Sequence, residues 1–241
     1  MSTSWGPLYR AGAIAAFAAV IVFRPHLGAE TMLLRSLGLL AFDPVPGGPL
    51  EWFTLLQARP FLGLLLLDVF DLVNYALVGL VFLALCGALR GVRKSLILCA
   101  AGACFAGITV YFASNPAFAM LSLSRQYAAA SEAQRASLLA AAQAVLAGCN
   151  PAGVYQGTGI YASVFLIHLA GLLAATAMLT SREFGRAAAV TGLLANGLYL
   201  LYFPVLALAP AWIALPPSLS APVRLVWYVL IAIRLLRLSR P

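Results

Sequence analysis

Long apolar runs recur along this chain, and their lengths predict membrane-spanning helices. A helix needs about 20 apolar residues to cross the hydrocarbon core of a bilayer, which is about 30 Å thick. The pattern predicts an all-α polytopic membrane protein with six transmembrane helices, forming a single integral membrane domain over residues 1–241. The predicted spans are 7–27, 61–88, 95–113, 155–179, 187–209 and 218–238.

Composition supports a membrane protein. The chain is 63% hydrophobic and only 9% charged, whereas soluble domains carry about 25% charged residues. The first apolar run is short for a span. A cleaved signal peptide is the competing interpretation of that run, because the small-residue pattern LGA precedes Glu30.

One further helix, over 132–147, is amphipathic rather than uniformly apolar. Ser131 followed three residues later by Gln134 forms a capping box, which predicts the start of this helix. Gly148 is placed to end it. We expect this helix outside the membrane on the extracytoplasmic side, lying flat over the bundle or at the interface.

The run 61–88 carries two carboxylates, Asp68 and Asp71, in an otherwise apolar sequence. In one continuous helix they would share a face with Tyr75. A carboxylate exposed to lipid near the bilayer centre costs about 3 kcal/mol. We therefore expect both side chains to face protein or water, either as a ligand, proton or ion site or as a structural polar patch.

Basic residues alternate between the two sides of the predicted spans. One side carries nine basic residues and a single acid, Glu183, and the positive-inside rule places that side and both termini in the cytoplasm. The net charge of +8 is therefore an orientation signal, not evidence for nucleic-acid binding. The nine residues are Arg10, Arg90, Arg93, Lys94, Arg182, Arg186, Arg234, Arg237 and Arg240.

This topology brings several polar residues to similar depths in the outer half of the bundle, with His168 near the midplane. We predict that Arg224, a cation at the depth of the two carboxylates, pairs with Asp68 or Asp71. The candidate ligand-binding residues are Asp68, Asp71, Tyr75, Tyr161, His168, Asn196, Tyr199 and Arg224.

Several catalytic patterns are missing from the sequence. There is no HExxH, GxSxG or glycine-rich nucleotide loop. The paired aspartates of intramembrane proteases face each other from two helices, whereas Asp68 and Asp71 lie on one run without a GxGD motif. The four cysteines lack metal-ligand spacing, and we expect no disulfide at Cys149. We expect no cofactor and no metal.

Three functions remain open. The first is a non-enzymatic membrane protein that binds, senses or passes a small amphipathic or lipid ligand through a polar pocket in its outer half. The second is an intramembrane enzyme that uses Asp68 or Asp71 as a base, assisted by His168. The third is a structural subunit of a larger membrane complex, for which the small-residue helix faces are suited.

Two adjoining segments carry a family resemblance. The sequence NPAFAMLSLSRQYAAASEAQRASLLAAAQAVLA (115–147), followed by YQGTGIYAS (155–163), resembles the bacterial membrane proteins grouped as domain of unknown function 4386. The resemblance implies a bacterial inner-membrane protein with six spans. It implies no activity and assigns no site residue.

Overall fold

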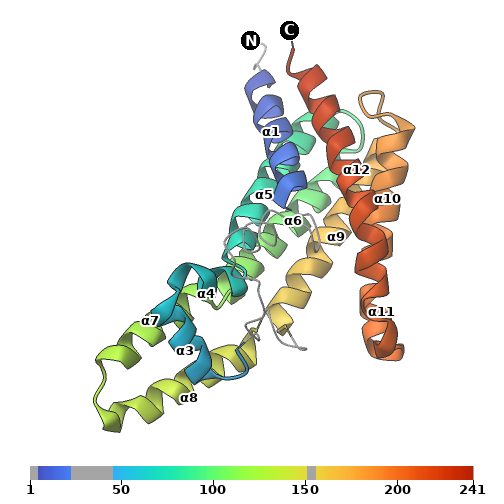
Figure 1. The fold of residues 1–241 in the computed structure, drawn as a ribbon. Coiled ribbons are helices and arrows are strands. Elements are labelled where there is room, and N and C mark those ends of the chain that lie inside the picture. The colour runs from blue at the N-terminus through green and yellow to red at the C-terminus, as the bar shows by residue number, and fades with distance from the viewer. Residues whose placement is uncertain (1–4, 23–45, 151–155, 241) are drawn as a thin grey trace. The chain divides into compact units, whose positions relative to one another are not determined.

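The computed structural model describes residues 5–22, 46–150 and 156–240, and every secondary-structure element in those ranges is a helix (Figure 1). The all-α prediction is therefore confirmed for the described chain. Three sequence features lie outside the described residues. They are the end of the first predicted span, the LGA pattern before Glu30 and the start of the fourth span at Tyr155.

Five stretches are long and apolar enough to cross a membrane, which supports a membrane protein. The first predicted span corresponds to α1 (Gly6–Val22), whose 17 residues are fewer than those of the other candidates. At 1.5 Å per residue, α1 is about 26 Å long. The five stretches are Val69–Leu89, Lys94–Ala129, Thr158–Met178, Arg186–Leu208 and Pro210–Leu238.

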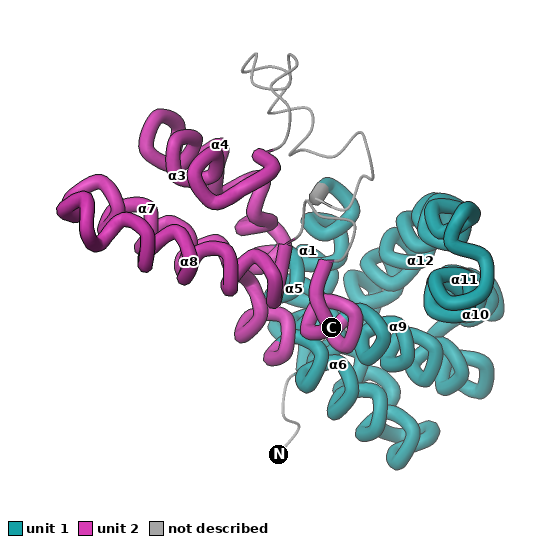
Figure 2. The backbone as a smooth tube through the Cα atoms, turned by 90° about the horizontal axis from the view of Figure 1, so that it is seen from below, with its two compact units in different colours: residues 1–29, 74–108, 164–241 teal, residues 30–73, 109–163 magenta. Residues whose placement is uncertain are grey.

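The chain divides into two compact units, which are coloured separately in Figure 2. Three of the four boundaries fall inside long helices, α5 (Val69–Leu89), α6 (Lys94–Ser114) and α9 (Thr158–Met178), and the fourth lies outside the described residues. Unit 1 comprises residues 1–29, 74–108 and 164–241, and unit 2 comprises residues 30–73 and 109–163.

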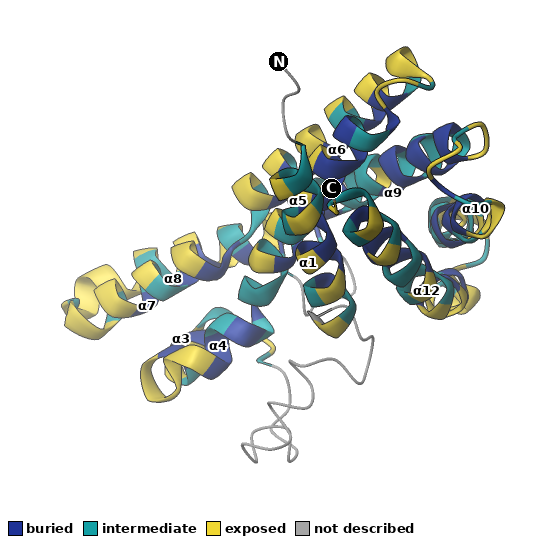
Figure 3. Ribbon diagram, turned by 90° about the horizontal axis from the view of Figure 1, so that it is seen from above, coloured by how far each residue is buried: buried dark blue, intermediate teal, exposed yellow. Residues whose placement is uncertain are grey.

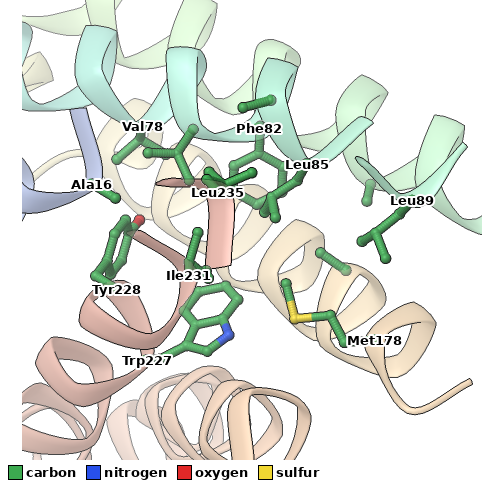
Figure 4. Close-up of a cluster of buried hydrophobic side chains, with 14 of the residues drawn as sticks. Ala16, Val78, Phe82, Leu85, Leu89, Met178, Trp227, Tyr228, Ile231 and Leu235 are labelled. Atoms are coloured by element: carbon green, nitrogen blue, oxygen red, sulfur yellow. The ribbon is translucent and has the colours of Figure 1, made fainter. Parts of the chain in front are cut away.

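Unit 1 is a helical bundle in which α12 (Leu215–Leu238) packs against α1 and α10 (Arg186–Leu200). Its apolar core includes Trp227 and Ile231 of α12 together with Val78 and Phe82 of α5, all buried (Figure 4). Alanines and glycines line many of the contacts, which allows the helix backbones to approach closely.

The basic segments of unit 1 gather at one end of the bundle. The guanidinium of Arg90, after α5, lies 4.5 Å from the ring centroid of Trp5, just before α1. A Cβ added to Gly185, before α10, would lie 3.2 Å from Arg234 Nη2 of α12. The start of α1 and the ends of α5 and α12 therefore share one end of unit 1, as the alternation of basic residues predicts (Figure 1).

Exposed residues line the outward faces of the unit 1 helices (Figure 3), and many of them are large and hydrophobic. Large exposed hydrophobic side chains occur on α1, α6, α10 and α12, together with the short helix α11 (Tyr202–Leu208). Contiguous apolar surface of this kind marks contact with a membrane or another protein. Examples are Ile14, Ile21, Leu98, Leu194, Leu208 and Val226.

Unit 2 packs three short helices around a second core. Trp52 and Phe53 of α3 (Pro49–Ala58) are fully buried against α7 (Ala117–Ala129) and α8 (Glu132–Gly148). The hydroxyl of Ser124, on α7, donates to the carbonyl of Phe53 at 3.2 Å. This bond satisfies a polar group that is buried between two helices.

The predicted amphipathic helix over 132–147 is confirmed as α8. Its start carries the reciprocal contact of the capping box, because Gln134 Oε1 accepts the backbone N–H of Ser131 at 3.2 Å. The helix ends at Gly148, as predicted.

The run 61–88 is not one helix. It forms α4 (Pro60–Leu66) and α5, separated at Leu67 and Asp68, and Asp68 has a φ of 58°. The prediction that Asp68 shares a continuous helical face with Asp71 and Tyr75 is therefore wrong. Asparagine and aspartate are the non-glycine residues that best tolerate this left-handed conformation, which explains why the break falls at Asp68.

Asn115 stabilises the break from the junction of α6 and α7. Its Nδ2 lies 3.2 Å from the carbonyl oxygen of Leu67 and 3.4 Å from that of Asp68. Its Oδ1 accepts the backbone N–H of Ala117 at 3.0 Å. One side chain thus satisfies backbone groups on both interrupted helices, as apolar surroundings require.

We predict that the positive φ at position 68 limits which residues are tolerated there. Asp68→Gly and Asp68→Val both remove the carboxylate, so the difference between their free energies of unfolding reports the backbone conformation, which glycine adopts without strain. Asp68→Val should lose about 1–2 kcal/mol relative to the glycine variant. Denaturant titration in detergent measures both changes, and equal losses in the two variants would show that the carboxylate itself carries the stability.

Candidate functional site

A cluster of polar side chains lies inside the otherwise apolar unit 1. His168 is at the middle of α9, Asn196 is on α10, and Arg224 is on α12. His168 is 5% exposed and Asn196 is 2% exposed, whereas Arg224 is half-buried. The cluster therefore runs from the interior of the bundle toward its surface.

A chain of hydrogen bonds determines which nitrogen of His168 carries a proton. Asn196 Nδ2 donates to the carbonyl of Gly192 at 2.8 Å, which leaves Asn196 Oδ1 as an acceptor. That oxygen lies 3.0 Å from His168 Nδ1, so Nδ1 must be the donor. The Nε2 lone pair then faces Arg224 Nη1 at 3.5 Å, and an arginine can only donate. His168 is therefore neutral and protonated at Nδ1.

Tyr199 covers one face of this cluster. Its ring stacks on the imidazole of His168 with centroids 3.9 Å apart and an interplanar angle of 11°. The Cζ atom of Arg224 lies 5.6 Å from the centroid of the same tyrosine ring, within the range of a cation–π contact. His168 and Arg224 are thus both held by Tyr199 as well as by each other.

The absence of a side chain at Gly171 makes room for Asn196. A Cβ added to Gly171 would overlap the amide group of Asn196, including Oδ1. Gly171 follows His168 by three residues on α9, so the glycine and the histidine face the same neighbour. The close approach of α9 and α10 is what brings Asn196 within hydrogen-bonding distance of His168.

A small cavity of about 30 Å³ adjoins the cluster. A volume of this size accommodates a water molecule and is far below the 300–1,000 Å³ of a typical ligand pocket. The Nε1 of Trp227 is buried and makes no hydrogen bond to any described residue, so water in the cavity is a suitable partner for it. The lining includes Tyr75, His168, Asn196, Arg224, Trp227 and Tyr228.

The candidate residues from the sequence divide between the two units. Tyr75, His168, Asn196, Tyr199 and Arg224 belong to unit 1, where each touches the cluster or lines its cavity.

Asp68, Asp71 and Tyr161 belong to unit 2. There Asp71 Oδ2 accepts the hydroxyl of Tyr111 at 3.4 Å, and Tyr161 Oη lies 3.5 Å from the backbone nitrogen of Gln156. The predicted pairing of Arg224 with either aspartate joins residues of different units and stays a prediction.

Three residues that line the cavity or contact the candidate aspartates were not predicted from the sequence. Trp227 is one of many aromatic residues in apolar runs, and nothing in the sequence distinguishes it. Asn115, directly before Pro116, and Tyr111 are not among the candidate residues that the sequence predicts. The spacing of four between Tyr111 and Asn115 was the available signal, because it places two polar side chains on the same face of a helix.

Comparison with protein-family models, curated proteins and solved structures found no match for this chain. Among the described residues, no group of three or more His, Cys, Asp or Glu side chains could hold a metal ion.

Cys149 lies outside the candidate spans, immediately after α8, and is buried. Burial raises the pKa of its thiol to about 11, and the nearby Asp68 carboxylate contributes in the same direction. Only the thiolate is a good nucleophile, so Cys149 is unreactive at neutral pH.

We predict that Gly171→Ala disrupts the His168–Asn196 contact. The added methyl group must displace the Asn196 amide, which should lower the free energy of unfolding by about 1–3 kcal/mol. Gly197→Ala on α10 is the matched control, because no atom lies within 4 Å of a Cβ built there. The control should be neutral or stabilising, since alanine favours helix. Equal destabilisation of both variants in denaturant titration would contradict the proposed packing.

We predict that Cys149 alkylates slowly in the folded protein. With its pKa near 11, the thiolate fraction at pH 8 is about 100-fold below that of an ordinary thiol. Iodoacetamide labelling followed by peptide mass spectrometry should show slow modification that accelerates above pH 10 or on unfolding. Asp68→Asn should raise the rate at pH 8. Rapid labelling of the folded wild-type protein at pH 7 would refute this assignment.

Proposed function

We propose that this protein is a bacterial inner-membrane protein with six spans and cytoplasmic termini that binds a small amphipathic ligand. The polar end of the ligand is received by the cluster of His168, Asn196, Tyr199 and Arg224. The five candidate spans and the common basic end of unit 1 support this membrane arrangement. Membership of the family that the sequence resembles is part of the same proposal.

The observation that carries the proposal is the Arg224 guanidinium beside the Nε2 of a neutral His168. A guanidinium presents several N–H donors in a rigid plane, and it matches carboxylate and phosphate groups better than other side chains do. One nitrogen of the Arg224 guanidinium faces His168 Nε2, and the Tyr199 ring lies beside its Cζ atom. The geometry favours a ligand with an anionic polar end.

The apolar surroundings favour an amphipathic ligand over a simple ion. Val78, Phe82 and Ile167 line the cavity together with the polar residues. A hydrocarbon tail attached to the anionic group would therefore lie against side chains of matching polarity. Because the cavity accommodates only water at its present volume, binding requires movement of the half-buried Arg224 and Tyr199 side chains.

The same geometry supports binding rather than base catalysis at His168. A general base must offer its lone pair to a proton of the substrate within about 3 Å. The Nδ1 of His168 carries its proton toward Asn196, and the Nε2 lone pair faces Arg224. The imidazole acts in this arrangement as a support for the arginine.

We expect Arg224→Gln to abolish stabilisation by an anionic amphiphile. Wild-type protein in a neutral detergent should melt roughly 5–10 °C higher with dodecyl phosphate or laurate at a hundredfold excess over Kd. Neutral dodecanol should have little effect. The glutamine variant should lose the response because it keeps a polar side chain but removes the positive charge and the planar set of guanidinium donors.

Arg234→Gln provides the matched control on the same helix. Arg234 lies beside Gly185 at the basic end of unit 1, away from the cluster. This variant should keep the wild-type response to both probes. If Arg224→Gln and Arg234→Gln respond as the wild type does, the cluster does not bind the anionic group.

A further inference from the structure

A second feature of unit 1 lies at its basic end, independent of the His168 cluster. The turn between α5 and α6 borders a shallow groove that is largely open to its surroundings. The groove is lined by Val92, Arg93, Lys94, Ser95, Leu96 and Leu98.

Polarity changes sharply along this groove. Arg93, Lys94 and Ser95 are consecutive exposed polar residues, and Leu98 follows with 59% of its surface exposed. From Lys94 to Leu98 the helix rises about 6 Å. The headgroup layer of one leaflet is about 5–8 Å thick, since the whole bilayer of about 40–45 Å contains a core of about 30 Å. The charged and the apolar side chains of the groove are therefore separated by about the thickness of one headgroup layer.

The charge around the groove is strongly positive. Arg90 contacts the ring of Trp5, whereas Arg93 and Lys94 line the groove itself. Unit 1 contains a single acidic residue, Glu183. An anionic occupant would therefore meet two adjacent cations and the hydroxyl of Ser95. A zwitterionic occupant would bring a positive group into the same basic surroundings.

We infer that this groove binds an anionic phospholipid from the leaflet at the basic end of unit 1. Arg93, Lys94 and Ser95 contact the phosphate, and the first part of an acyl chain lies along Leu98. The observation that identifies the occupant is the combination of two exposed cations with the exposed Leu98, which lies one helical turn after Lys94 on the same face. A soluble phosphate compound would leave Leu98 uncovered.

The test measures lipid retention by the full-length protein after delipidation in detergent. Native mass spectrometry should show dioleoyl phosphatidylglycerol bound in preference to dioleoyl phosphatidylcholine. The double variant Arg93→Gln/Lys94→Gln should lose phosphatidylglycerol affinity roughly 30-fold, because each cation near the lipid contributes about a factor of five. Inorganic phosphate at equal concentration should not compete.

Arg182→Gln/Arg186→Gln is the matched control, because it removes the same charge from the connection between α9 and α10 and from the first residue of α10. It should retain phosphatidylglycerol. If both double variants lose phosphatidylglycerol affinity equally, general electrostatic attraction explains the binding and the proposed site is wrong. If inorganic phosphate competes with the lipid, the assignment of a lipid ligand is wrong.

A second measurement is independent of the folding of any variant. Photoreactive phosphatidylglycerol should label a peptide containing residues 92–98 in the wild-type protein. Labelling confined to other segments would contradict the proposal.

Discussion

Buried hydrogen-bonding groups in an apolar helical protein are costly without a partner, and in each unit one asparagine side chain supplies partners for several such groups. In unit 1, the amide of Asn196 connects the backbone of Gly192 to the imidazole of His168. In unit 2, the amide of Asn115 connects the interrupted end of α4 to the start of α7. An unsatisfied amide in such surroundings costs several kcal/mol, so these hydrogen bonds fix the side-chain orientation of Asn115 and Asn196.

The two asparagines have different consequences. Asn115 satisfies backbone groups where two helices are interrupted, so its role is to permit irregular backbone in an apolar segment. Asn196 determines the tautomer of a side chain, and it thereby determines how the positively charged Arg224 is held. The first arrangement explains a feature of the fold, and the second creates a chemically specific site.

Glycine and alanine residues in unit 1 allow the close helix packing that places these polar groups in contact. Gly171 allows the Asn196 amide to reach α9, and Gly192 lies against the indole of Trp227, where a Cβ would approach Nε1 to 2.5 Å. Helices in an apolar environment gain little from hydrophobic burial against each other and depend on close packing instead. The same small residues that permit this packing place the polar groups of α9, α10 and α12 in contact.

The sequence by itself determined the helical class and most helix positions, since these follow from apolar run length, and it marked His168, Asn196 and Arg224 as polar residues within such runs without indicating their mutual contacts. It also predicted α8 from its capping box, a purely local pattern. Only the tertiary structure decided where the run 61–88 breaks, because the positive φ of Asp68 is stabilised by Asn115, a residue distant in the chain. The tautomer of His168 was likewise decided by contacts among three helices, which no local pattern encodes.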